Sequence, residues 1–212
     1  MPVAAGLAAV IAAAFGWCPP LGAHELTVRA FHDLAAVPGI WRSALLSGVT
    51  GFASAALSFL AAALLLAAYH RSAKFSALRH VLSPLLSLPH AALALGFAFL
   101  IAPSGILFRL AAPAAGWDLP PDVLTVHDRW GVSLIAGLVL KEVSFLFLMM
   151  LAALPQTGAA RYLPVAASLG YAPGIGFLKV VMPLVYPQLR LPIIAVIAYA
   201  ASAADVALIL GP

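Results

Sequence analysis

Two adjacent ionisable residues, Lys141 and Glu142, stand near the middle of the apolar run "GVSLIAGLVLKEVSFLFLMML". Ionisable groups at that depth in a membrane are costly and usually face the bundle interior or water. Adjacent residues on a helix point about 100° apart, so the two side chains cannot simply pair with each other. They are candidates for a translocation path or a gate, and a structural anchor is the alternative interpretation.

Asp205 is the third ionisable candidate, in the outer half of the last apolar run. Its carboxylate could contact a substrate, close an outer gate or cap a helix break near the external face. The surrounding "AYAASAAD" is rich in small residues, which allow helices to approach closely. Packing is therefore the first interpretation of this stretch.

Other chemistries lack the residue patterns that they need. The six histidines, at positions 24, 32, 70, 80, 90 and 127, have no zinc-site spacing, and Cys18 is the only cysteine. We interpret His90 as a hydrogen-bonded helix contact. No Gly-x-x-x-x-Gly-Lys-Ser/Thr motif occurs, since "GIGFLK" at 174–179 has no Ser/Thr after it. We predict no catalytic residue, no metal site and no cofactor bound by this chain, and we expect a protein that is not an enzyme.

The composition indicates that these residues are carried by membrane helices. The chain has 212 residues, of which 64% are hydrophobic and 8% charged, whereas a soluble domain is about 25% charged. Its apolar runs are long and rich in Ala and Leu, which favours helices over a barrel. We predict an all-α integral membrane protein. The net charge of +4 fits basic cytoplasmic loops, and no nucleic-acid partner is expected.

One span needs about 20 apolar residues. The chain is expected to hold about five transmembrane helices, at residues 3–17, 41–69, 81–101, 131–154 and 183–210. The first run is short and ends at two prolines, and we favour a retained span over a signal peptide because no basic residue precedes it. Pro84 and Pro89 predict kinks in the third span. We divide the chain into an N-terminal span with an external loop, residues 1–40, and a transmembrane domain, residues 41–212.

The connecting segments differ in charge. In the segments around 70–80 and 155–190 every charged residue is basic. These residues are Arg71, Lys74, Arg79, Arg161, Lys179 and Arg190. The other two segments, 18–40 and 102–130, have more acidic than basic residues. The positive-inside rule therefore places the loops 70–80 and 155–180 in the cytoplasm of a multi-pass membrane protein.

The segment "VAASLGYAPGIGFLKVVMPLV", residues 165–185, is too polar and too broken for a membrane-buried helix. Tyr162, Ala166 and Leu169 form one helical stripe, and Gly170 follows at a C-cap position. Pro173 can begin a second helix. The pattern predicts a helix–turn–helix with small residues at the bend.

The second helix of this segment has an apolar face made by Phe177, Val180 and Val181, and Pro183 marks the entry into the last span. A short amphipathic helix held between two spans is suited to dock into a groove of another protein. An ordinary connector that rests on lipid headgroups is the alternative.

The segment resembles the "EAA" loop of permeases of binding-protein-dependent ABC importers. That pattern is Glu-Ala-Ala, three residues, Gly, nine residues and Ile-x-Leu-Pro. With Gly170 as the anchor, the closing motif falls on Val180-Val181-Met182-Pro183, and Pro164 stands where the family has glutamate. The resemblance implies an ATPase-coupling loop formed by Pro164, Val165, Ala166, Leu169, Gly170, Pro173, Phe177, Val180 and Pro183.

The order of spans and loops over residues 41–212 also resembles the MetI-like superfamily. The closing "DVALILGP" is similar to the same region in permeases for thiamine, sulfate, iron or polyamines. The resemblance implies a permease of the bacterial inner (plasma) membrane that forms the translocation path of an ATP-driven importer. The family core continues with a further span, so we expect a fragment or one half of a double-length permease.

The same resemblance implies the partners. They are a cytoplasmic ATPase dimer that binds the ATP, a second permease half, an external substrate-binding protein and membrane lipid. The alternative function is a proton-coupled secondary transporter with Lys141, Glu142 and Asp205 as a relay, which would need no ATPase.

Overall fold

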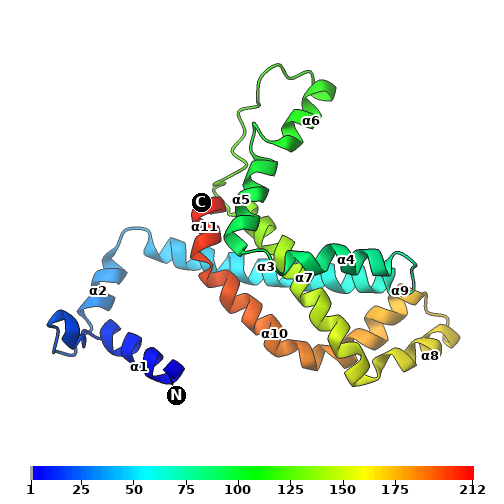
Figure 1. The fold of residues 1–212 in the computed structure, drawn as a ribbon, viewed down its shortest axis with the longest axis horizontal. Helices are drawn as coiled ribbons and strands as arrows, with labels where there is room; N and C mark the ends of the chain where they lie inside the picture. The colour runs from blue at the N-terminus through cyan, green and yellow to red at the C-terminus, as the bar shows by residue number, and fades with distance from the viewer. Residues whose placement is uncertain (1) are drawn as a thin grey trace. The chain divides into compact units, whose positions relative to one another are not determined.

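The computed structural model describes residues 2–212, apart from the side chains of residues 159 and 160. Every regular element in that part of the chain is a helix, and the described residues form no strand (Figure 1). Four described helical stretches are long and apolar enough to cross a membrane: Ile40–Tyr69, His90–Ala115, Val132–Thr157 and Pro173–Ser202. The predicted all-α membrane fold is confirmed, with four candidate spans in place of about five.

The chain divides into two compact units, Met1–Leu45 and Leu46–Pro212. In the first unit, α1 (Pro2–Ala14), a short 3-10 turn (Pro19–Leu21) and α2 (Arg29–Ala36) precede the start of α3. The first apolar run is helical, as expected, but α1 has 13 residues, which is fewer than a span needs. Met1 lies outside the described residues.

Small residues set the packing of the second unit. Its first helix, α3 (Ile40–Tyr69), buries mainly Thr, Gly, Ser and Ala against α7 (Val132–Thr157) and α10 (Met182–Ser202). A Cβ added at Gly51 would lie 2.8 Å from the backbone nitrogen of Ala201 in α10. The two backbones therefore come close because this position has no side chain. Further along, Leu66, Phe147 and Val185 lie fully buried in the main core.

The expected third span is broken into separate helices. These are α4 (Phe75–Leu85), α5 (His90–Ile101) and α6 (Ile106–Ala115). Pro89 does not kink a continuous helix: α4 ends at Leu85, and Pro89, with an extended ψ of 143°, is the N-cap of α5. Pro84 is accommodated inside α4. The loop expected over 102–130 was predicted wrongly in part, since the apolar residues after Gly105 continue as α6.

The expected last span is also two helices, α10 and α11 (Ala204–Leu210). They meet at Ala203, whose ψ of 73° is outside the helical region. Figure 1 shows α11 turned away from the axis of α10 and lying beside α5. Val206 and Leu210 of α11 pack into a second core with Leu138 of α7 and Ala94 of α5.

Candidate functional site

The turn of the loop between α7 and α10 has the geometry that its sequence predicts. The first helix of the loop is α8 (Leu163–Ser168), and the second begins as α9 (Pro173–Gly176). Between them, Gly170 has φ = 84° and its amide donates to the carbonyl of Ala167 at 3.0 Å. A Cβ on Gly170 would meet no atom within 4 Å. The glycine is therefore needed for its backbone conformation and not for space.

The second half of the loop differs from the prediction. After α9 the chain continues through a π-helical segment, Phe177–Val181, directly into α10. The last candidate span therefore begins at Pro173, and the expectation that Pro183 opens it is wrong. Pro183 stands two residues after the end of the π segment, where its missing N–H falls at the change from π-type to α-type hydrogen bonding. The π segment, in which the Met182 amide donates to the Phe177 carbonyl, takes up the change in hydrogen bonding.

The loop has a buried side and an exposed side. Ala166 and Phe177 are buried against the bundle, and Val180 is half-buried. The stripe expected from Tyr162, Ala166 and Leu169 is not a packed face, since Tyr162 is 43% exposed and Leu169 72%. Within α8, Ala166 is buried and Leu163 packs partly buried against the main core. We call the outward apolar residues the exposed loop face; it consists of Tyr162, Val165, Leu169, Tyr171 and Ile175.

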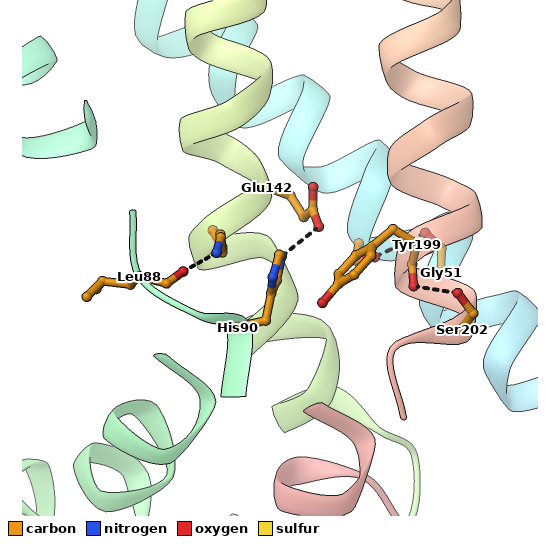
Figure 2. A network of polar contacts seen from close by, with 8 residues as sticks. Gly51, Leu88, His90, Glu142, Tyr199 and Ser202 are labelled. Atoms are coloured by element: carbon orange, nitrogen blue, oxygen red, sulfur yellow. Dashed lines mark hydrogen bonds and ion pairs between the residues drawn. The ribbon is translucent and has the colours of Figure 1, made fainter. Parts of the chain in front are cut away.

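Helix α7 places Lys141 and Glu142 on the two sides of the break between α4 and α5. Both side chains are buried, 8% and 4% exposed. The ammonium of Lys141 donates to the carbonyl of Leu88, just before Pro89. The carboxylate of Glu142 lies 3.9 Å from Nε2 of His90, in the first turn of α5 (Figure 2). The prediction that the two neighbours do not simply pair agrees with this arrangement, in which each has its own partner.

These contacts complement the dipoles of the broken helix. A cation is favoured near the carbonyl end of a helix and an anion near its amide end. Lys141 meets a carbonyl that follows the end of α4, and Glu142 meets the beginning of α5. In the anchor interpretation each buried charge has a partner within the protein.

The same residues also line a cavity. The His90 ring packs against Tyr199 of α10 with centroids 4.3 Å apart and the ring planes tilted by 38°, and Figure 2 shows the tyrosine ring beside the His90–Glu142 contact. A cavity of about 340 Å³ is lined by Leu86, His90, Lys141, Glu142, Phe145, Ala195, Val196 and Tyr199. We call His90, Lys141, Glu142 and Tyr199 the polar cluster. The path interpretation remains a prediction that this cavity supports.

The structure does not bring Asp205 into this cavity. Asp205 is exposed and lies in the first turn of α11, directly after the bend at Ala203. Of the three roles considered for it, the position fits that of a carboxylate at a helix break. Sequence reasoning missed Tyr199 as a neighbour of Glu142. The sequence did contain a signal for the position of His90: it follows Pro89 in "LPHAAL", and a proline there marks the start of a helix.

The beginning of α7 is fixed by Asp128, which sequence reasoning did not single out. Its two carboxylate oxygens accept hydrogen bonds from the amides of Trp130, Val132 and Ser133 and from the Ser133 hydroxyl, at 2.6–3.2 Å. Burial by itself would raise the pKa of Asp128, but these hydrogen bonds outweigh it and lower the pKa from its ordinary value. The ionised carboxylate therefore caps the helix that carries Lys141 and Glu142.

The backbone of Leu210 and Gly211 lies against the beginning of α7 and the residues just before it. The Ser133 hydroxyl also lies 2.9 Å from the carbonyl of Leu210, and Nδ1 of His127 lies 2.6 Å from that of Gly211. Across the residues that the structure describes, no three His, Cys, Asp or Glu side chains are grouped to hold a metal ion.

Comparison with known proteins gives one informative relative. No protein-family model matches the chain. The chain is 30% identical over 187 residues to the inner membrane ABC transporter permease protein YnjC of Escherichia coli strain K12. The aligned region is 88% of this chain and 35% of the relative, so the chain spans about a third of the length of that protein. The similarity agrees with the ABC permease resemblance of the loop. The MetI-like subgroup and the truncation remain predictions.

Proposed function

We propose that the chain is part of the membrane-spanning permease component of an ATP-driven ABC importer. The observation that carries the proposal is the helix–turn–helix between α7 and α10, with its glycine turn and its exposed loop face. The similarity to an ABC transporter permease supports it. In this proposal a separate cytoplasmic ATPase dimer binds and hydrolyses ATP, and this chain catalyses no reaction.

The exposed loop face supports docking over a plain connector. Val165 and Leu169 are 53% and 72% exposed on a segment outside the expected bilayer region. Apolar side chains in such a place point to a protein partner. Pro164, which replaces the family's glutamate, lies in the first turn of α8, where proline favours helix initiation. The chain therefore keeps the helix while it lacks the acidic contact.

The uneven burial of the spans supports a second permease half. Only 11% of the apolar stretch in His90–Ala115 is buried, against 50% in Val132–Thr157. Lipid covers such a surface, and so does a partner subunit. An external substrate-binding protein completes the proposed importer in the bacterial inner membrane. The polar cluster then lines the path or a gate.

A proton-coupled secondary transporter is the second candidate. The observation that favours it is the buried Glu142 carboxylate facing His90 at 3.9 Å. Such a carrier would need no ATPase. Its uptake would follow the proton gradient and be lost in Glu142→Gln.

Substitutions at Gly170 test the proposal. The variant Gly170→Val forces a β-branched residue into the left-handed region, whereas Gly170→Asn is the matched control because asparagine tolerates it. We expect Gly170→Val to lower the recovery of a co-purifying P-loop ATPase about five- to thirty-fold, the equivalent of about 1–2 kcal/mol of backbone strain. Gly170→Asn should keep the ATPase.

Equal ATPase recovery from Gly170→Val and the unmodified chain, both well folded by circular dichroism, would contradict coupling through this loop. Absence of any ATPase, together with uptake that collapses with the proton gradient, would favour the carrier.

A further inference from the structure

A second and larger cavity lies behind the loop, away from the polar cluster. It measures about 730 Å³, and ten residues line it: Leu66, His70, Arg71, Phe75, Leu151, Leu154, Leu163, Pro164, Ala167 and Phe177. They come from the end of α3, the segment after it, the start of α4, the end of α7, the helix α8 and the π segment. The cavity therefore separates the loop from the bundle, with walls on both.

The walls are apolar except for the imidazole of His70 and for Arg71 at one edge. Leu66, Leu151, Leu154 and Phe177 are packed in or against the main core. The His70 ring stacks on Phe177 with centroids 5.0 Å apart, and its Nδ1 lies 3.0 Å from the carbonyl of Leu66. Nδ1 of His70 is therefore engaged by the protein itself, whereas Nε2 is buried without a hydrogen-bond partner in the described residues.

Arg71 supplies the cationic edge of the cavity. Its side chain is exposed, and within the described chain no hydrogen bond or ion pair engages its guanidinium. Arg161, just before α8, and Lys179, in the π segment, are further basic residues of the same loop, although neither lines the cavity. No acidic residue occurs between 34 and 117 or between 143 and 204. The edge of the cavity is therefore suited to an anion.

An apolar cavity with a cationic edge at the end of a membrane bundle fits an amphipathic anion. We propose that this cavity binds an anionic phospholipid, with an acyl chain between the loop and the bundle and the phosphate at Arg71. Basic pockets between spans on the cytoplasmic side recognise such headgroups, and guanidinium binds phosphate with paired hydrogen bonds. A lipid with a neutral headgroup would occupy the same cavity without the contact to Arg71.

The bound lipid would connect the loop to the bundle. Leu163 and Ala167 belong to α8, whereas Leu66 and Leu151 belong to α3 and α7. An acyl chain in contact with all four restricts movement of α8 against the bundle. This inference does not depend on an ATPase, so it can be tested independently of the proposed function.

Native mass spectrometry of the full chain, purified in mild detergent, tests the site. The probes are phosphatidylglycerol and phosphatidylcholine with identical acyl chains. We expect phosphatidylglycerol to be retained about five-fold more than phosphatidylcholine, the preference expected for one basic contact. Arg71→Gln should remove that preference. The matched control Lys74→Gln, an exposed position in the same segment that does not line the cavity, should keep it.

The acyl chain is tested separately from the headgroup. Ala167→Phe fills the cavity from the exposed side of α8 and should reduce retention of both lipids. Glycerol 3-phosphate in excess should not displace the lipid, because the headgroup alone lacks the apolar contacts. In the unmodified chain, a phosphatidylglycerol with a photoreactive acyl chain should label the peptide that contains Leu151 and Leu154.

Three results would overturn the proposal. They are equal retention of the two lipids by the unmodified chain, an equal loss of preference in Lys74→Gln and Arg71→Gln, and photolabelling that avoids the cavity walls. The photolabelling needs no variant, so it decides the question even where Ala167→Phe fails to fold.

Discussion

Lys141 and Glu142 are neighbours in the sequence, yet they meet opposite sides of one broken helix. The lysine donates to the carbonyl of Leu88 and the glutamate faces His90. The sequence could single out both charges because they interrupt an apolar run. It could not identify the partner of Lys141, since the carbonyl of Leu88 is free to accept only because the chain is not helical between α4 and α5.

The anchor role predicts a loss of stability. In Lys141→Met the carbonyl of Leu88 loses its donor at a partly buried place, which costs on the order of 1 kcal/mol. We expect a lower unfolding midpoint in detergent than for the unmodified chain. Lys74→Met is the matched control, because Lys74 is exposed, and it should leave the midpoint unchanged. An unchanged midpoint in Lys141→Met combined with lost transport would instead favour the path role.

Asp128 makes the stability of the chain depend on pH. Its pKa in the folded protein is lower than its ordinary value, so the folded state favours the ionised form. The stabilisation is present above the pKa of the unfolded chain and is lost as the pH falls through the folded pKa. Asp128→Ala should lower stability by about 1 kcal/mol near neutral pH.

The unfolding midpoint measured from pH 7 down to pH 3 checks this. The difference between the unmodified chain and Asp128→Ala should narrow toward the acid end. Asp122→Ala, at an exposed aspartate of the same connection, should not change it. A difference that stays constant across the range would contradict the role of the ionised carboxylate.

At the scale of the elements, two glycines of one helix offer a direct comparison. A Cβ on Gly51 would meet backbone atoms of Ala201 at 2.8–2.9 Å, whereas a Cβ on Gly48 would meet nothing within 4 Å. We expect Gly51→Ala to destabilise the packing of α3 on α10. Gly48→Ala should be neutral or slightly stabilising, because alanine has the higher helix propensity.

Thermal unfolding of the two alanine variants, side by side in the same detergent, measures the difference. Equal midpoints would mean that α3 and α10 can separate without cost, contrary to the packing described.

The helices themselves could be predicted to different degrees. The apolar runs that became α3 and α7 were predicted nearly to their ends, since length and composition alone decide them. The glycine turn was predicted because Gly170 is one of few residues suited to a left-handed conformation. The π segment was not predicted, and the break at Ala203 was considered only as one of three roles for Asp205. No residue type marks them, and packing of Val206 and Leu210 against other helices decides the bend.

At the scale of the whole molecule, the orientation in the membrane is the prediction that the basic residues make. Cys18 is the only cysteine, so a Cys18→Ser background allows single cysteines to be placed at will. We expect Asp122→Cys to react with an impermeant maleimide in intact spheroplasts. Lys74→Cys should react only after the membrane is opened. Labelling of both in intact spheroplasts would overturn the assignment of the two faces.

The architecture was predicted from the resemblance of one loop and from composition, and the relative in Escherichia coli agrees with it. The number of spans was not predicted correctly, because α1 is helical and apolar but only 13 residues long. Length alone could not distinguish a short span from a short helix.

The π segment at Phe177–Val181 ties the register of α10 to the loop. A π turn holds one more residue than an α turn. Conversion of that segment to regular α-helix would shift all later residues by one position, a rotation of about 100° and an advance of about 1.5 Å. Tyr199 would then turn away from His90, the ring against which it now packs. A change in the winding of the π segment could thus alter the contact between Tyr199 and His90 in the polar cluster, with no need for the helix to bend or tilt.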